Sequence, residues 1–150
     1  DAYCGIGTIG LVAASRAGSV LSIELNPDAV RDAIANAKRN GIGNVRFYRA
    51  DAGEFLTGMA ARGEKADVLF MDPPRSGSTE AFMKSAAALG PERIVYISCN
   101  PETLGRDLRV LSRLGYQAGE VWPVDMFPWT ESCEAAVCLT RKEKQDVKGR

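Results

Sequence analysis

One pattern recurs along this chain and restricts its fold more than any other: a short apolar run is followed at once by a helix start. The run at 93–97 leads to Ser98 and Cys99, and Asn100-Pro101 then provides a helix N-cap and a proline at the first helical position, where its missing N–H costs nothing. The run at 19–24 is followed by the same signal, an Asn-Pro pair at 26–27. Apolar strands that alternate with helices through short connections are typical of a parallel sheet with helices on both faces.

The whole sequence follows this alternation, so we predict a Rossmann-like α/β fold with a doubly wound, mostly parallel, seven-stranded sheet and a C-terminal antiparallel hairpin. The chain starts at Asp1 with only the end of a first strand ahead of a glycine-rich turn, so we expect a piece of a longer polypeptide whose first strand is cut short. We expect one domain at 1–141 and a disordered charged tail at 142–150. The six further strands are expected at 19–24, 45–48, 67–71, 93–97, 116–124 and 134–140. The first helix is expected to start within the glycine-rich segment and to continue over 11–17, and the others are expected at 26–40, 51–62, 79–89 and 102–114.

The composition narrows the chemistry that is available. Lysine plus arginine and aspartate plus glutamate are equal at 19 each, so most phosphate contacts of a nucleic-acid partner would have to come from elsewhere. Histidine is absent, so any general base must be a carboxylate, lysine, tyrosine or cysteine. The four cysteines form no C-x-x-C pair, so we expect no metal site, no disulfides and a reducing, cytoplasmic setting. No run is long enough to span a membrane, and we expect no membrane partner.

A glycine pattern, G-x-G-x-x-G at 5–10, stands between the first strand and the first helix. Such glycines let the backbone approach a ligand closely, and Glu24 at the end of the next strand could accept hydrogen bonds from ribose hydroxyls. A dinucleotide, S-adenosylmethionine and a plain tight turn are the alternatives. Asp1, four residues before Gly5, favours S-adenosylmethionine, because an acid suits a cationic amino acid group and would repel a pyrophosphate. Asp51, after the third strand, suits either an adenine amino group or a helix N-cap.

Three further features follow the ends of predicted strands. The sequence D-P-P-R at 72–75 is stiffened by its prolines, either as a plain strand exit or as part of a base pocket lined by Asp72. Cys99 lies just ahead of a helix N-terminus, whose dipole favours a thiolate, although a lone cysteine is more often a buried structural residue. In the aromatic loop at 127–130, Trp129 is either a stacking surface for a nucleobase or part of the core.

These segments carry a resemblance to a known family. The sequences D-P-P-R-S-G at 72–77 and I-V-Y-I-S-C-N-P-E-T at 94–103 resemble two signatures of the RNA uracil-C5 methyltransferases, and 124–134 resembles a third. The resemblance covers nearly the whole chain and implies the fold of S-adenosylmethionine-dependent methyltransferases, with 1–141 as the catalytic domain. The chain departs from the family in having Ser132 where a histidine is usual, and Trp129 where another residue is usual.

The resemblance also implies roles for single residues. Cys99 is similar to the family nucleophile and Glu134 to its general base, although exposed glutamates such as Glu131 and Glu134 are usually only solvated. The implied cofactor is S-adenosylmethionine and the implied partner is RNA. The expected cofactor-binding residues are Tyr3, Gly5, Gly7, Thr8, Glu24, Asp51 and Asp72, and the expected substrate-binding residues are Asp72, Arg75, Phe127 and Trp129.

The implied reaction is methyl transfer to C5 of a uridine in RNA through an adduct between Cys99 and C6, with 23S rRNA as the expected substrate and tRNA as the alternative. An RNA cytosine-C5 methyltransferase is the nearest rival, but those enzymes typically have a second cysteine where this chain has Arg75. A dinucleotide-binding or non-catalytic Rossmann domain is a further rival, which would not need Cys99. We expect most RNA affinity to come from an N-terminal part, where the family often has a β-barrel domain and sometimes an iron–sulfur site.

Overall fold

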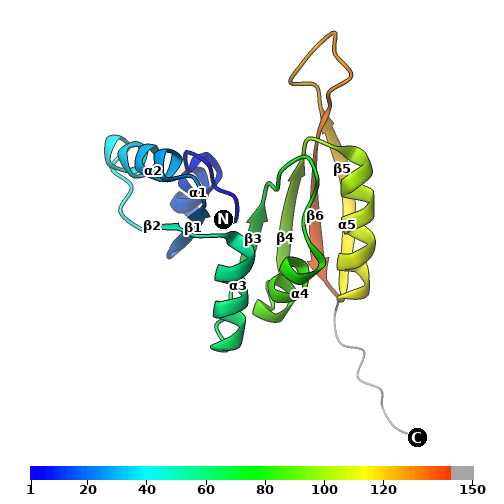
Figure 1. Ribbon diagram of the computed structural model, residues 1–150, viewed down its shortest axis with the longest axis horizontal. Helices are drawn as coiled ribbons and strands as arrows, with labels where there is room; N and C mark the ends of the chain where they lie inside the picture. The colour runs from blue at the N-terminus through cyan, green and yellow to red at the C-terminus, as the bar shows by residue number, and fades with distance from the viewer. Residues whose placement is uncertain (143–150) are drawn as a thin grey trace, which may run out of the picture.

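The computed structural model describes residues 1–142, so the predicted tail at 142–150 lies outside the described residues except for its first one. In this part of the chain six strands alternate with five α-helices, close to the predicted positions. No helix in it is long and apolar enough to cross a membrane. The strands are β1 (Val20–Glu24), β2 (Val45–Arg49), β3 (Val68–Met71), β4 (Arg93–Ser98), β5 (Tyr116–Val124) and β6 (Glu134–Arg141). The helices are α1 (Thr8–Ala13) with the 3-10 helix η1 (Ala14–Arg16), α2 (Pro27–Arg39), α3 (Ala52–Ala61), α4 (Glu80–Leu89) and α5 (Pro101–Arg113) (Figure 1).

The predicted helix starts are confirmed by their caps. The Asn26 side chain accepts hydrogen bonds from the backbone N–H groups of Asp28 and Ala29, and the Asn100 side chain accepts one from Glu102. Both helices have a proline in the first turn. The caps satisfy N–H groups that the first helical turn leaves without partners, so the chain changes direction in a fixed way after β1 and after β4.

The sheet order brings the ends of the predicted site strands to one edge. β1 pairs in parallel with β2, β3 pairs in parallel with β4, and β6 is antiparallel to both β4 and β5. Ala2 joins the two parts, because it forms parallel bridges to Ile23 in β1 and to Met71 in β3. The predicted Rossmann-like α/β fold with a C-terminal hairpin is confirmed. Within residues 1–142, however, the segment around Ala2 takes the place of a seventh strand.

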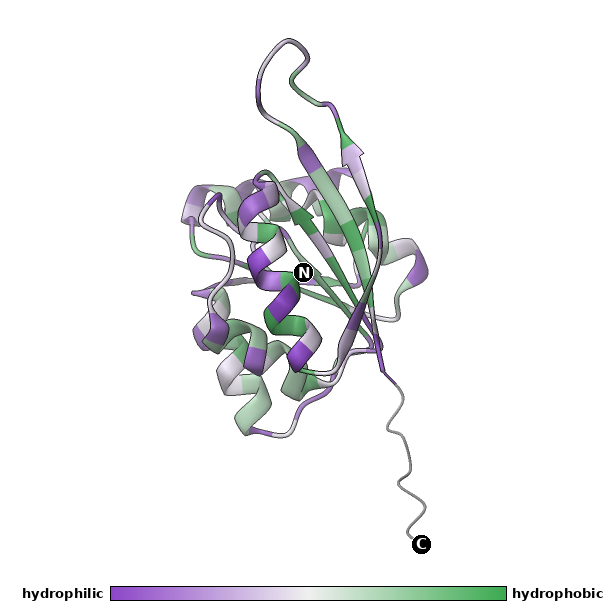
Figure 2. Ribbon diagram, turned by 90° about the vertical axis from the view of Figure 1, so that its right-hand side faces the viewer, coloured by the Kyte–Doolittle hydropathy of each residue, from purple (hydrophilic) through white to green (hydrophobic). Residues whose placement is uncertain are grey.

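The core lies between β3, β4 and β6 and the helices α3, α4 and α5, which run along these strands (Figure 1). Tyr96 of β4, Phe82 of α4 and Leu111 of α5 are almost completely buried. The strands are largely coloured as apolar in Figure 2, whereas the helices carry both apolar and polar residues. Burying one large apolar side chain contributes roughly 1.5–3 kcal/mol to the free energy of unfolding. This core therefore fixes the strands whose ends carry the predicted site residues.

The opposite face of the same strands is only partly covered. Cross-strand partners lie on the same face of a sheet, so the register defines which side chains share this one. The helices α1 and α2 pack against β1 and β2 instead. Within the described residues, helices therefore cover only one face of β3, β4 and β6. The partly or fully exposed side chains of this face are Phe70, Val95, Ile97, Ala136, Cys138 and Trp122.

Candidate active site

The thiol of Cys99 lies in a tightly held turn at the end of β4. The Ser98 hydroxyl accepts a hydrogen bond from the Asn100 N–H at 3.1 Å and donates one to the Asn100 carbonyl at 2.9 Å. Cys99 stands between these two residues, half-buried and not in a disulfide. Because Asn100 also caps α5, the position of Cys99 is fixed from both sides. The alternative of a fully buried structural cysteine does not apply.

The strand register places Glu134 beside this turn. Ser98 of β4 pairs with Ala135 of β6 in an antiparallel arrangement, so the residue that follows Ser98 and the residue that precedes Ala135 are neighbours. These residues are Cys99 and Glu134. Both line a cavity of about 310 Å³, and Glu131 is not among its lining residues. The residues that line the cavity are Arg75, Cys99, Phe127, Thr130, Ser132 and Glu134.

A second carboxylate stands close to Glu134. Asp72 directly follows β3, at the same edge of the sheet as the end of β4. Partial burial, and then the negative charge of Glu134, raise the pKa of Asp72 above its ordinary value. Asp72 is not among the residues that line the cavity of Cys99 and Glu134. Two neighbouring acids whose like charges repel each other are typical of a functional site, and they suit a ligand that brings positive charge or hydrogen-bond donors.

The aromatic loop between β5 and β6 forms one wall of the cavity. The Thr130 hydroxyl donates to the Phe127 carbonyl at 2.7 Å and accepts from the Ser132 N–H at 3.2 Å, which fixes the loop internally. Phe127 is half exposed and lines the cavity. Trp129 is fully exposed, with φ of +69°, and is not among the residues that line the cavity, so the alternative of a core residue is wrong.

The glycine turn is anchored by Glu24, one of the predicted cofactor residues. Glu24 Oε2 accepts a hydrogen bond from the Gly5 N–H at 2.9 Å, and Oε1 accepts one from the Asn26 N–H at 2.8 Å. Gly7 has φ of +87°, and a Cβ at this position would lie 2.9 Å from the ring of Phe47. Glycine is therefore required here both by the backbone conformation and by the space.

Asp1 also contacts the glycine turn, through a buried hydrogen bond. It is 9% exposed, and its Oδ2 accepts a hydrogen bond from the Gly10 N–H at 2.8 Å. A Cβ on Gly10 would lie 2.8 Å from that oxygen and 2.6 Å from the Ser22 hydroxyl. Oδ1 of Asp1 is buried without a partner among residues 1–142. We predicted that Asp1 faces the cationic group of a ligand; in the structure it lies under the glycine turn instead.

The remaining predicted cofactor residues occupy different settings. Tyr3 has φ of +64°, packs on the ring of Phe82 at 5.3 Å, and has its pKa raised by burial. Asp51 is exposed and caps α3 by accepting a hydrogen bond from Glu54 N–H at 2.9 Å, as one of its two predicted roles requires. Thr8 is exposed at the start of α1 and lines a separate cavity of about 290 Å³ between α1 and α2, not the cavity around Cys99.

These settings are compatible with a nucleoside ligand over the glycine turn. Glu24 is the last residue of β1, and Asp51 and Asp72 follow the ends of β2 and β3. Their acceptor oxygens therefore lie at the edge of the sheet where α/β proteins bind ligands. Positive φ at Gly5 and Gly7 leaves the backbone of the turn open to close approach. The residues present thus fit a ligand with ribose hydroxyls and an amino group.

Sequence reasoning missed two parts of this site. Thr130 and Ser132 line the cavity, yet Ser132 stood out only as a departure from a family pattern. Asp107, on α5, is fully buried and accepts a hydrogen bond from Tyr96 of β4, the strand that ends just before Cys99. Its spacing from Leu104 and Leu111, three and four residues away, was the available signal, because residues at this spacing share one helix face.

Comparison with known proteins adds to this geometry. The family described as tRNA (Uracil-5-)-methyltransferase matches residues 1–142. The chain belongs to this family. It is 49% identical over 142 residues to an uncharacterised RNA methyltransferase of Halalkalibacterium halodurans, a match that covers 95% of this chain and 31% of that protein.

Solved structures agree with the family assignment. The tRNA (uracil-54, C5)-methyltransferase of Pyrococcus abyssi, in complex with S-adenosyl-L-homocysteine, is 33% identical with a TM-score of 0.81, over 93% of this chain and 33% of that one. The magnesium protoporphyrin IX methyltransferase of Synechocystis is 15% identical with a TM-score of 0.73, over 95% of this chain and 68% of that one, and shows the methyltransferase fold alone. This chain spans about a third of the length of the RNA methyltransferases of Halalkalibacterium halodurans and Pyrococcus abyssi.

Proposed function

We propose that this chain is the catalytic part of an enzyme that transfers a methyl group from S-adenosylmethionine to C5 of a uridine in RNA. The observation that carries the proposal is the common cavity of Cys99 and Glu134, which the pairing of Ser98 with Ala135 brings about. Membership of the uracil-C5 methyltransferase family supports it. Cys99 acts as the nucleophile and Glu134 as the general base.

The reaction follows from the chemistry of uracil, whose C5 is too weak a nucleophile to take a methyl group unaided. The Cys99 thiolate adds to C6, and the electrons of the C5–C6 double bond move onto the C4 carbonyl to give an enolate. C5 of the enolate then takes the methyl group, whose bond to the sulfonium sulfur breaks with its electron pair staying on sulfur, so that S-adenosylhomocysteine is the leaving group. The Glu134 carboxylate removes the C5 proton, the double bond re-forms, and the Cys99 thiolate leaves.

The glycine-turn side is the proposed site of the methyl donor. When bound, S-adenosylmethionine supplies an electrophilic methyl group. Gly5 and Gly7 allow its close approach, and Glu24 and Asp51 offer acceptors for ribose hydroxyls and for the adenine amino group. The other proposed donor-binding residues are Tyr3, Thr8 and Asp72.

The substrate base is proposed to enter the cavity between the D-P-P-R loop and the aromatic loop. Asp72 accepts a hydrogen bond from the uracil edge, Arg75 contributes the positive charge of the cavity wall, and Phe127 packs on the base. Trp129, which is fully exposed beyond the cavity, stacks on a neighbouring base of the RNA. Cys99 is the one cysteine that lines the cavity, which favours uracil over the cytosine chemistry that employs a second cysteine.

The RNA class has two candidates. Our sequence-based prediction is 23S rRNA, with most RNA affinity outside this chain, whereas the descriptions of the family and of the Pyrococcus abyssi relative both favour tRNA. We also propose the cytoplasm as the compartment, supported by four cysteines that form no disulfide among residues 1–142.

The proposal is tested by incubating the natural full-length polypeptide with methyl-labelled S-adenosylmethionine and separate pools of rRNA and tRNA. The expected product is 5-methyluridine in one pool, and mapping of the labelled nucleotide decides between the two RNA classes. Label in cytidine, or none in either pool, would contradict the proposed reaction.

A further inference from the structure

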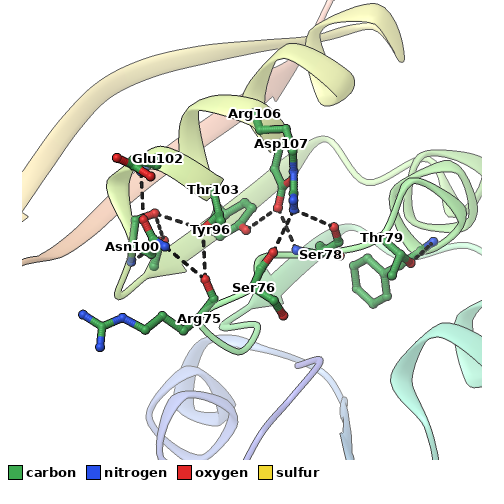
Figure 3. A network of polar contacts seen from close by, with 12 residues as sticks. Arg75, Ser76, Ser78, Thr79, Tyr96, Asn100, Glu102, Thr103, Arg106 and Asp107 are labelled. Carbon is green, nitrogen blue, oxygen red and sulfur yellow. Dashed lines mark hydrogen bonds and ion pairs between the residues drawn. The ribbon is translucent and has the colours of Figure 1, made fainter.

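A buried polar cluster joins α5, which begins two residues after Cys99, to the loop at 76–78, and the reaction above does not use it. Its centre is Asp107 of α5, which is fully buried. Asp107 Oδ2 accepts hydrogen bonds from the Tyr96 hydroxyl and from the Ser78 N–H, both at 2.7 Å, and Oδ1 lies 2.8 Å from the Arg106 guanidinium (Figure 3). A buried carboxylate is costly unless it is paired and hydrogen-bonded, so all of these partners are needed together.

The cluster holds the far end of the D-P-P-R loop. Arg106 Nη2 donates to the carbonyl oxygens of Ser76 at 3.0 Å and Ser78 at 3.1 Å. Gly77, between them, has φ of +76°, and a Cβ there would lie 2.6 Å from Arg106 Nη2 and 2.8 Å from Asp107 Oδ2. The loop backbone therefore rests directly on the ion pair, with no room for a side chain.

The near end of the same loop is held by the first turn of α5. Asn100 Nδ2 and Thr103 Oγ1 donate to the Arg75 carbonyl at 3.2 and 3.3 Å (Figure 3). This helix begins two residues after Cys99. One helix thus carries the groups that fix both ends of the loop and also follows directly from the reactive turn.

We propose that Asp107 and Arg106 are positioning residues that fix the loop at 72–79 against Cys99, so that Asp72 and Arg75 meet the substrate base in one orientation. Neither residue is among those that line the cavity, so they act through the loop. The inference rests on the proposed function. Because misplacement by about 1 Å costs about 100-fold in rate, loss of the cluster lowers kcat. The affinity for the methyl donor should change much less than kcat, because the glycine turn is not part of the cluster and Asp72 is the one proposed donor-binding residue on the loop.

Two tyrosines provide a matched test. Tyr96 and Tyr116 are both almost completely buried, and each hydroxyl donates one hydrogen bond to the protein. That of Tyr96 goes to Asp107, and that of Tyr116 goes to the Pro91 carbonyl at 2.9 Å, near the start of β4 and away from Cys99. Replacement of either tyrosine by phenylalanine removes one buried hydrogen bond, so the two variants should lose similar stability.

The experiment compares wild type, Tyr96→Phe, Tyr116→Phe, Asp107→Asn and Arg106→Lys in the natural full-length polypeptide. The measured quantities are kcat, KM for RNA, the affinity for S-adenosylhomocysteine and the melting temperature. We expect kcat to fall about 10-fold in Tyr96→Phe and about 100-fold in Asp107→Asn, with S-adenosylhomocysteine affinity changed less than about twofold. Arg106→Lys should resemble Asp107→Asn, because a lysine does not bridge the carboxylate and two carbonyls at once. Tyr116→Phe should keep kcat within about twofold of wild type.

Equal kcat values for Tyr96→Phe and Tyr116→Phe would overturn the positioning role, and so would a loss of S-adenosylhomocysteine affinity that matches the loss in rate. If Asp107→Asn does not fold, the kcat values of the two tyrosine variants still test the positioning role. A wild-type polypeptide that transfers no methyl group to RNA would overturn the proposed function and this inference with it. An active wild type with indistinguishable tyrosine variants would overturn this inference alone.

Discussion

The two sides of the candidate site hold their charged side chains in different ways. On the glycine-turn side, the carboxylates of Asp1, Glu24 and Asp51 each accept a hydrogen bond from a backbone N–H group. These acids are part of the local fold, because each satisfies a donor in a turn or at a helix start. A change on this side is expected to affect the fold and the binding of the methyl donor together.

On the Cys99 side, the side chains of Cys99, Asp72 and Glu134 form no hydrogen bond within residues 1–142, while the backbone that carries them is held firmly by the strand ends and by α5. Within residues 1–142 these three side chains are therefore free of hydrogen bonds, whereas the backbone that carries them is fixed. The contrast teaches that substitutions on this side should change the chemistry with little effect on the fold.

The largest effect is expected for Cys99→Ala. Loss of the nucleophile should lower methyl transfer by at least about 1,000-fold, because no adduct forms to activate C5. The free energy of unfolding should change by less than roughly 1 kcal/mol, since the thiol is only half buried. Methyl-transfer assays and urea unfolding measure the two quantities. Residual turnover near the wild-type rate would remove Cys99 from the mechanism.

On the other side, Gly10→Ala should reduce stability and donor binding together. The new Cβ would lie 2.6 Å from the Ser22 hydroxyl and 2.8 Å from Asp1 Oδ2, and relieving such overlap costs roughly 1–3 kcal/mol. Gly18→Ala is the matched control, because a Cβ there meets no atom within 4 Å. Urea unfolding and titration with S-adenosylhomocysteine test both variants. Equal stability and equal S-adenosylhomocysteine affinity in the two variants would show that the turn accommodates a Cβ at Gly10, which would contradict the described packing.

A smaller, pH-dependent effect is expected for Asp72→Asn. The folded-state pKa of Asp72 is raised by burial and by Glu134, so its contribution to stability is present below the ordinary value of about 4 and is lost as pH rises through the folded value. The asparagine side chain does not ionise, so the variant does not lose this stability as pH rises. Its melting temperature should therefore exceed that of wild type at pH 7.5, with the difference shrinking toward pH 4, although methyl transfer falls.

The melting temperature of Glu134→Gln between pH 4 and pH 7.5 tests whether the charge of Glu134 raises the pKa of Asp72. Removing that charge lowers the pKa of Asp72, so the pH-dependent loss should be smaller than in wild type. An Asp72→Asn variant that melts below wild type at pH 7.5 would contradict the described electrostatics.

The smallest effect is a difference in reactivity between Cys4 and two other cysteines, Cys99 and Cys138. Burial, and then the charge of Glu24, raise the pKa of Cys4 to about 11, so almost no thiolate is present at pH 8. We expect iodoacetamide at this pH to label Cys99 and the exposed Cys138 while Cys4 stays unlabelled until the protein unfolds, as peptide mass spectrometry would show. Rapid labelling of Cys4 in the folded protein would contradict the burial of the glycine turn.

The sequence predicts the features of the fold that depend on neighbouring residues alone, such as strand ends and helix caps. The Asn-Pro pairs at 26–27 and 100–101 carry their own capping groups, so the strand ends and helix starts were placed to within a residue or two. The direction of Asp1 could not be predicted, because Gly10 and Ser22, which surround it, are brought there by the fold. The exposure of Trp129 likewise depends on how far the final hairpin extends beyond the sheet (Figure 1).

The most direct test of the central claim is a covalent adduct between protein and RNA in Glu134→Gln. If Cys99 adds to C6 and Glu134 removes the C5 proton, the glutamine variant should stop after methyl transfer and retain the RNA on Cys99 through denaturation, as a shifted band and a modified Cys99 peptide. Glu131→Gln, three residues earlier and outside the cavity lining, should release methylated RNA like wild type. An adduct in Glu131→Gln but not in Glu134→Gln, or none in either, would contradict the account.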